Sequence, residues 1–315
     1  MKTTTLHYAS RDGKSTIHAL VWEPDASAGE TPKPRGIVQI VHGMSEHVER
    51  YEPFAKFLVS GGFVVCANDH VGHGASVGDA SDLGHMPAHG GAEVLVEDAH
   101  ALRETLAARY PDAPYVMFGH SMGSFIARKY ITEHGEGLAA AVLCGTGQQA
   151  VVLSMAGNAL ACALACVRGE RHKSVLLHSV ADGAYSKAVE NPRTDFDWLS
   201  CDPVQVDAYI ADPKCGCMFT VGGYATLTSL TGEVVRAASA NKVPKGLPLL
   251  FVAGGEDPVG DCGRGVQKAV AEYKAAGVRV VDMKLYPGMR HEILNESGRG
   301  QVMADVVEWL AKQGI

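Results

Sequence analysis

Short apolar runs alternate along the chain with longer segments in which apolar residues recur every three or four positions. The short runs predict β-strands at 36–41, 63–67, 115–118, 139–144, 249–253 and 278–285. The longer segments predict helices at 50–60, 93–109, 122–133, 263–276 and 300–312. Strands that alternate with helices in this way predict an α/β fold, with a mostly parallel central sheet flanked by helices. The first 25 residues instead alternate apolar and polar positions, which predicts an antiparallel hairpin at the edge of the sheet.

The alternation stops between residues 147 and about 244. This segment is rich in apolar helix and turn signals and has no clear strand, so it is too long and too regular to be a crossover loop. We expect an α/β core formed by 1–147 and 245–315, with a helical cap, 148–244, inserted before the last strands. The apolar run 150–167 within the cap is short for a membrane span, which favours a buried or surface-facing helix.

A candidate nucleophile lies in the segment Gly119-His120-Ser121-Met122-Gly123, which follows a predicted strand directly and opens a predicted helix. A turn this sharp leaves no space for side chains at its flanking positions, which accounts for the two glycines. The central serine is expected in a strained conformation above the sheet, where the free N–H groups and partial positive charge of the helix N-terminus lie beneath it. The alternative is a glycine-rich turn without chemistry.

A serine hydroxyl needs a base that takes its proton. Of the 14 histidines, only His291 lies after residue 178, in a loop just past the last predicted strand. Asp257 follows another strand end and is expected to orient the imidazole, with Glu256 and Asp261 as rival carboxylates. The resulting chain order, Ser then Asp then His, is the order found with this strand–turn–helix motif.

Acyl transfer also requires two preorganised donors for the oxyanion of the tetrahedral intermediate. One candidate is the backbone N–H of Met122, directly after the serine. The other is the backbone N–H of Met44, in the loop that follows the strand ending at Val41, where Gly43 lets the backbone turn inward.

Two groups of residues could suggest a metal site. Cys215 and Cys217 are the one close pair among the 8 cysteines, but a zinc site would need a second pair or a matching histidine run, and neither is present. The segment 69–76 carries an aspartate and two histidines among glycines, and a tight loop with local hydrogen bonds is the favoured interpretation. We expect no metal and no organic cofactor.

Composition narrows the classes of partner. A hydrophobic content of 46% over 315 residues supports a substantial core and excludes wholesale disorder. A net charge of −7 without a basic run excludes nucleic acid as a favoured partner. Most cysteines lie in apolar runs and the first residues contain no apolar signal region, which predicts a cytoplasmic protein. The oligomeric state is left open.

The segments 42–51, 69–74, 119–123, Asp257 and 286–296 follow one another along the chain. Together they resemble the monoacylglycerol lipase and lysophospholipase branch of the α/β-hydrolases, which is related to the serine aminopeptidase-like hydrolases. The resemblance implies the α/β-hydrolase fold, with Ser121 as nucleophile, His291 as base and Asp257 as its partner. It also implies Met44 and Met122 as oxyanion donors. Ser124 departs from the family pattern, which often has a glycine there.

The resemblance implies a serine hydrolase that cleaves carboxylic esters through an acyl-enzyme, of the monoacylglycerol lipase or lysophospholipase kind. An aminopeptidase, an amidase or an acyltransferase would use the same triad. An aminopeptidase should also present acidic residues to a substrate amine, for which Glu190 and Asp195 are cap candidates. A relative that binds a ligand without turnover is the alternative from a different class.

The apolar residues of the cap predict a small-molecule ester with an apolar acyl group as substrate. The residues expected to line its pocket are Val152, Met155, Phe196, Trp198, Met218 and Phe219. The alternative is that they form only the cap's own core. A peripheral contact of the apolar cap face with a membrane is also compatible with the pattern.

Overall fold

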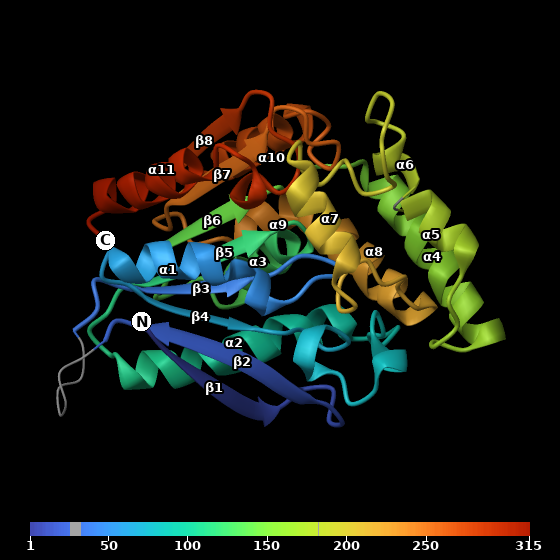
Figure 1. Cartoon of the computed structure of the whole chain (residues 1–315), viewed down its shortest axis with the longest axis horizontal. Helices are drawn as coiled ribbons and strands as arrows, with labels where there is room; N and C mark the ends of the chain where they lie inside the picture. The colour runs from blue at the N-terminus through green and yellow to red at the C-terminus, as the bar shows by residue number, and fades with distance from the viewer. Residues whose placement is uncertain (26–32, 182) are drawn as a thin grey trace.

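A mostly parallel sheet forms the centre of the computed structural model, which describes residues 1–25, 33–181 and 183–315 (Figure 1). Its strands are β1 (Lys2–Ala9), β2 (Thr16–Glu23), β3 (Ile37–Val41), β4 (Val64–Asn68), β5 (Tyr115–His120), β6 (Ala140–Cys144), β7 (Leu249–Gly254) and β8 (Val281–Tyr286). Their spatial order is β1-β2-β4-β3-β5-β6-β7-β8. The β1–β2 and β2–β4 pairs are antiparallel and the others are parallel, so the predicted edge hairpin and parallel sheet are confirmed.

Helices cover both faces of this sheet. They are α1 (Glu52–Ser60), α2 (Gly91–Arg109), α3 (Met122–Glu133), α10 (Arg264–Ala275) and α11 (Arg299–Lys312). Side chains of α2, α3 and α10 join one buried apolar cluster, and those of α1 and α11 join a second cluster on the other face. Every residue of β3, β4 and β6 is buried, as expected for parallel strands covered on both sides.

A group of helices separates β6 from β7 along the chain. They are α4 (Val151–Arg168), α5 (Val175–Ala181), α6 (Gly183–Ser186), α7 (Pro203–Ala211), α8 (Val221–Val234) and α9 (Ala237–Lys242). Of these, α4, α5, α6 and α8 lie at the right of Figure 1. The described part of this segment contains no strand, as the sequence predicts. Tyr224 and Leu230 of α8 belong to the same buried cluster as α2 and α3, so the cap shares its core with the sheet. The division at 148–244 therefore stays a prediction.

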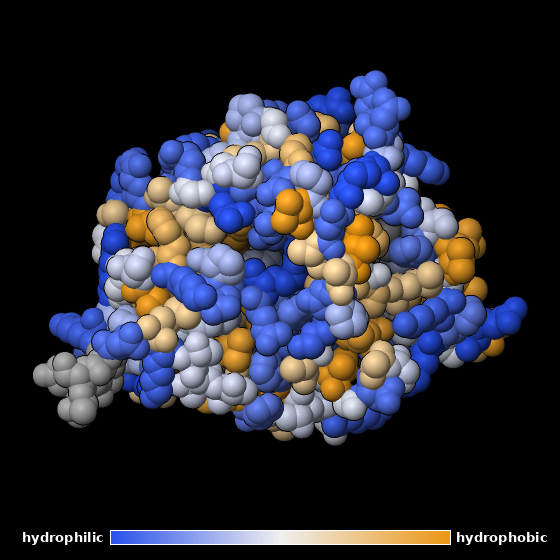
Figure 2. Space-filling model, viewed as in Figure 1, coloured by the Kyte–Doolittle hydropathy of each residue, from blue (hydrophilic) through white to orange (hydrophobic). Residues whose placement is uncertain are grey.

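Helix α4 is long and apolar enough to cross a membrane by length and composition, yet only 11% of it is buried in the fold. It packs along α8, where the Asn158 side-chain amide donates a hydrogen bond to the Ala225 carbonyl at 2.9 Å. Its other side leaves large apolar side chains exposed, among them Val152 and Val167, and α5 adds Val175 and further residues. Hydrophobic surface over these cap helices is visible at the right of Figure 2. The expected surface-facing helix is therefore present.

One buried arginine contacts the chain at the start of the cap and again at the end of α8. Arg128 of α3 is fully buried, and it donates hydrogen bonds to the carbonyl of Gly147 at 2.8 Å and of Val234 at 2.9 Å. A third bond reaches the Gln148 side chain at 2.7 Å. The chain therefore leaves β6 and returns toward β7 past the same guanidinium.

Candidate active site

Ser121 lies in the turn between β5 and α3 with φ 53° and ψ −122°, a region that side-chain-bearing residues rarely adopt. The two neighbouring glycines explain how the chain reaches it. A Cβ atom at Gly119 would collide with the carbonyl of Gly123, and one at Gly123 would collide with the carbonyl of Val41. The strained strand–turn–helix geometry expected from the sequence is present, with α3 beginning at the next residue.

His291 and Asp257 are hydrogen-bonded, although 34 residues separate them. The His291 Nδ1 lies 2.9 Å from the Asp257 Oδ1, and both side chains are buried. The Val259 backbone N–H donates a second bond to the same carboxylate oxygen at 2.9 Å. The other ring nitrogen, Nε2, is buried without a hydrogen-bond partner among the described residues. An imidazole fixed through Nδ1 has Nε2 available as a base.

The rival carboxylates lie elsewhere. Glu256 is exposed, and Asp261 is half-exposed and pairs with Arg264 at 2.7 Å. Of the three carboxylates considered for the role, the structure brings only Asp257 to the imidazole.

The two backbone groups considered as oxyanion donors flank the serine. Met44 and Met122 line the same cavity as Ser121. Neither the Met44 N–H nor the Met122 N–H donates to a described residue. The loop approaches so closely that a Cβ atom at Gly43 would lie 3.0 Å from the Ser121 Cβ. The backbone geometry is therefore compatible with two amides left for a ligand oxygen.

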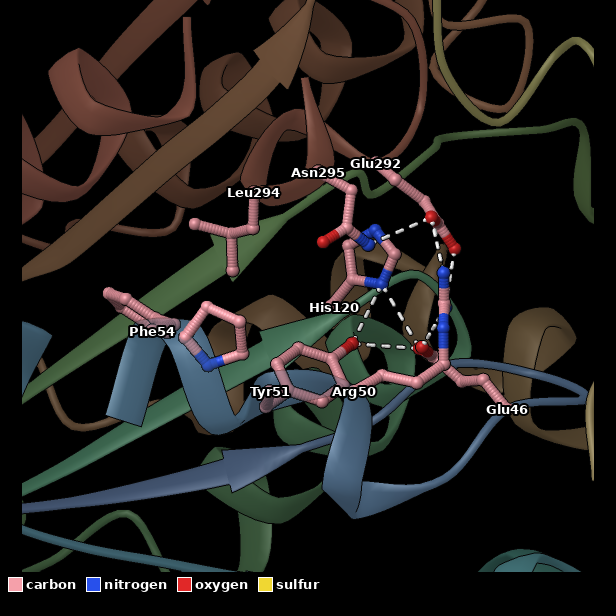
Figure 3. Close-up of a pocket in the computed structure, with 9 residues that line it drawn as sticks. Glu46, Arg50, Tyr51, Phe54, His120, Glu292, Leu294 and Asn295 are labelled. Atoms are coloured by element: carbon pink, nitrogen blue, oxygen red, sulfur yellow. Dashed lines mark hydrogen bonds and ion pairs between the residues drawn. The ribbon is translucent and has the colours of Figure 1, made fainter. Parts of the chain in front are cut away.

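A buried charged cluster, which the sequence analysis missed, lies behind this loop (Figure 3). Arg50 pairs with Glu46 at 2.6 Å. Its two terminal guanidinium nitrogens each donate to a carboxylate oxygen of Glu292 at 2.7 Å. The Tyr51 hydroxyl donates to Glu46 at 2.7 Å and lies 3.0 Å from the His120 Nδ1. In Figure 3 these side chains point toward one another from the loop after β3, the end of β5 and the segment after β8.

The charges of this cluster stabilise one another. Burial alone would raise the pKa of the Glu46 carboxyl, but the hydrogen bond to His120 and the charge of Arg50 hold this pKa well below its usual range. Burial alone would lower the pKa of His120, and the hydrogen bond and charge of Glu46 raise it above its ordinary value instead. Both groups therefore favour their charged forms.

The cluster connects the three chain segments of the candidate site. Glu46 accepts the Gly43 N–H at 2.5 Å and so fixes the backbone next to Met44. His120 directly precedes Ser121, and Glu292 directly follows His291. The segments 46–51 and 291–296 belong to those that carry the family resemblance. Arg50 and Glu292 are 242 positions apart, so no nearby sequence pattern predicts that they form an ion pair.

Ser121 and His291 line one cavity of about 1090 Å³ between the sheet edge and the cap. Among the residues expected to contact substrate, Phe196 and Trp198 line it, and the Trp198 ring lies 5.1 Å from that of His291. The apolar wall is completed by residues that were not predicted, which include Phe125, Leu153, Leu177, Tyr224 and Leu227.

Four of the six expected lining residues do not line this cavity. Val152 and Met155 are 76% and 54% exposed, because the opposite face of α4 turns toward the cavity. Phe219 is fully buried against Tyr224 and His73, and Met218, beside it, does not line the cavity. Apolar character alone could not distinguish the inner face of the cap from its outer face.

The loop 69–76 is held by local hydrogen bonds. Asp69 accepts the backbone N–H of Val48 at 2.9 Å and of Ala75 at 2.8 Å, and its carboxylate fills the space that a Cβ at Gly74 would need. The carboxylate therefore serves as the centre of a tight loop, which agrees with the interpretation made from the sequence.

Comparisons with known proteins agree with this geometry. The family model described as serine aminopeptidase, S33 (Hydrolase_4) matches residues 32–298. The chain is 32% identical to a monoacylglycerol lipase of Mycolicibacterium smegmatis, over 92% of this chain and 91% of the relative. It is 26% identical to the human monoglyceride lipase, over 92% of this chain and 84% of the relative.

Solved structures are similar over the full length. A highly thermostable carboxyl esterase from Bacillus coagulans, in complex with glycerol, matches with a TM-score of 0.92 and 33% identity, over 100% of both chains. A lipase in an open form matches with a TM-score of 0.86 and 27% identity, over 99% of both chains. The α/β-hydrolase fold is thereby confirmed, with the cap included in the match.

Proposed function

The chain belongs to the serine aminopeptidase S33 family of α/β-hydrolases, and from this premise we propose that it is a serine carboxylesterase acting on monoacylglycerol-like esters. By homology it is a hydrolase of the esterase and lipase kind. The observation that carries the finer proposal is the bond between His291 and Asp257, at the wall of the cavity that Ser121 also lines.

The proposed reaction has two steps. The Ser121 Oγ attacks the ester carbonyl while the His291 Nε2 takes its proton, and the amides of Met44 and Met122 stabilise the oxyanion. Collapse of this intermediate breaks the bond to the alcohol, which leaves with the proton from the imidazole. Water, deprotonated by His291, then attacks the acyl-enzyme and releases the acid. Asp257 keeps the proton on Nδ1 and stabilises the imidazolium.

The cavity supports an ester with an apolar acyl group. Its volume of about 1090 Å³ exceeds what a short ester fills, and its walls are mostly aliphatic and aromatic. Of its carboxylates, Glu46 and Glu292 are already paired with Arg50. The named relatives include monoacylglycerol lipases and an esterase bound to glycerol, which favours a glycerol monoester as the substrate.

One observation keeps amides as a second candidate class. Asp195 lines the cavity, whereas Glu190 does not, so one cap carboxylate is placed where a substrate amine could meet it. The substrate panel should therefore contain aminoacyl anilides beside p-nitrophenyl esters and monoacylglycerols of increasing chain length. Preference for anilides over every ester would favour the aminopeptidase alternative.

The test of the nucleophile is Ser121→Ala. We expect wild type to react with a fluorophosphonate probe and to hydrolyse p-nitrophenyl butyrate, and the variant to lose the labelling and about 10⁴-fold or more of kcat. Ser60→Ala, which removes an exposed hydroxyl at the end of α1, is the matched control and should retain both. A folded wild type that fails both assays would support the non-catalytic binding alternative.

A further inference from the structure

Three side chains with metal-binding chemistry meet where the cap contacts the loop after β3. One ligand atom each of His47, Asp212 and Cys215 lies within 4.8 Å of the others. The His47 Nε2 lies 2.8 Å from the Asp212 Oδ2. His47 is buried, whereas Asp212 and Cys215 are partly exposed, so the group is open to solvent on one side. None of the three has a role in the proposed reaction.

Backbone hydrogen bonds build this arrangement. The Cys215 N–H donates to the Asp212 carbonyl at 3.0 Å, and this turn brings the two side chains together. The Lys214 N–H donates to the Asp212 Oδ1 at 2.8 Å, which leaves Oδ2 for His47. The turn is fixed to the loop of His47 because the Gly216 N–H donates to the Ser45 carbonyl at 3.0 Å.

A second observation concerns the other ring nitrogen of His47. The His47 Nδ1 is buried and has no hydrogen-bond partner among the described residues. A carboxylate oxygen of Glu49 lies 3.4 Å from this nitrogen. In protein metal sites, the ring nitrogen that does not bind the ion donates its proton to a carboxylate in this way. The Nε2, which now bonds to Asp212, would then be the ligand atom, and a small closure would complete the bond from Nδ1 to Glu49.

We propose that His47, Asp212 and Cys215 bind a divalent ion of the zinc class. An imidazole nitrogen, a carboxylate oxygen and a thiolate sulfur form a ligand set that suits Zn²⁺ and Co²⁺ and not the hard cations Mg²⁺ and Ca²⁺. Bonds of about 2.0–2.3 Å in a tetrahedron place ligand atoms about 3.3–3.7 Å apart, so the His47–Asp212 pair opens by less than about 1 Å. Water takes the fourth position.

Binding exchanges the ion for one proton. The Cys215 thiol releases its proton to solvent, and the proton of His47 moves from Nε2 to Nδ1, where Glu49 accepts it. The ion then replaces the hydrogen bond between His47 and Asp212 and links the cap to the loop that carries Met44. The sequence did not predict this site, because His47 is 165 positions away from Asp212.

The test uses the full chain without a histidine tag, freed of metal with a chelator and titrated with Co²⁺. We expect a thiolate-to-cobalt charge-transfer band and the visible bands of a tetrahedral ion, saturating at one ion per chain and lost on addition of Zn²⁺. Cys215→Ser should lose the charge-transfer band. Asp212→Asn should weaken binding about tenfold or more. Cys217→Ser is the matched control, two residues away, and should keep the band.

Thermal unfolding gives a second readout that does not depend on the spectrum. Zn²⁺ should raise the unfolding midpoint of wild type and of Cys217→Ser, and leave that of Cys215→Ser unchanged. A charge-transfer band that survives in Cys215→Ser would overturn the proposal. The absence of Co²⁺ binding to wild type at about 100 µM Co²⁺ would overturn it as well. Esterase activity is not needed for either measurement, so failure here and failure of the proposed function are distinguishable.

Discussion

Arg50 is the residue that links the two buried carboxylates of the candidate site. It pairs with Glu46 and Glu292, and all three side chains are at most 13% exposed. Its removal would leave the buried Glu292 without a counter-charge and Glu46 with His120 alone. Breaking a buried ion pair costs about 3–5 kcal/mol. We expect Arg50→Met to lower the free energy of unfolding by that amount in urea titrations.

The matched control is an exposed pair. Lys56 lies 2.8 Å from Glu52, with side chains 60% and 48% exposed. Exposed ion pairs contribute about 0–1 kcal/mol, so Lys56→Met should change the free energy of unfolding by less than that. Equal losses in Arg50→Met and Lys56→Met would contradict the view that burial makes the difference.

The residues of the proposed triad could be predicted from the sequence because each has a local signal. Ser121 lies in a strand–turn–helix motif, and Asp257 and His291 directly follow strand ends. Their catalytic roles stay predictions until the variants are measured. The partners of Arg50 could not be predicted, because a buried ion pair depends on which segments the fold brings together and not on sequence spacing.

At the scale of elements, the strands and helices follow the apolar pattern closely. Helix α3 has the predicted bounds. The helix expected at 50–60 begins later, because a 3-10 turn, Val48–Tyr51, precedes α1 and Pro53 occupies its first turn. The strand expected at 278–285 is Val281–Tyr286, since the chain still forms a turn bonded to Tyr273 at Val278. The faces of the cap helices were not predictable, because α4 is apolar nearly all round.

The exposed side of α4 leads to a prediction about membranes. Val152 and Val167 are 76% and 77% exposed, and their helix also contributes Leu153 and Leu160 to the cavity. We expect this face to bind phosphatidylcholine vesicles. Val152→Asp with Val167→Asp should weaken binding tenfold or more in co-sedimentation, because burial of one such side chain is worth about 1.5–3 kcal/mol.

The control for the membrane prediction is an exposed apolar residue outside the cap. Met283 lies on the edge strand β8, with 37% of its side chain exposed, and Met283→Asp should leave vesicle binding unchanged. Equal binding by the α4 variant and wild type would show that this face does not contact lipid.

At the scale of the whole molecule, three buried imidazoles make stability depend on pH. Burial lowers the pKa of His42 and His70 below the ordinary value and lowers that of His73 to about 3. Below about pH 6.5 the unfolded chain therefore binds more protons than the folded one. Stability that is present above this pH is lost as the pH falls, by up to about 1.4 kcal/mol per pH unit for each histidine.

Urea unfolding between pH 8 and pH 5 measures this slope, and His73→Asn should reduce it. His172→Asn, at an exposed position, is the control and should leave it unchanged. Asp98 acts in the opposite direction, because burial raises its pKa to about 6 and protonation there favours the folded state. The contribution of Asp98 is the same in wild type and in both histidine variants, so it cancels when their slopes are compared. An unchanged slope in His73→Asn would refute the claim that the buried His73 contributes to the pH dependence of stability.

The hydrogen bonds of Arg128 have a consequence for how the sequence of the cap can vary among related proteins. The backbone ladder of β6 and β7 sets their register, with Ala141 opposite Leu249, while Arg128 holds the chain at Gly147 and at Val234. This register therefore does not depend on the length of the chain between Gly147 and Val234. Changes in the parts of the cap that do not share the buried core would then remodel what the enzyme accepts and leave the register of β6 and β7 intact.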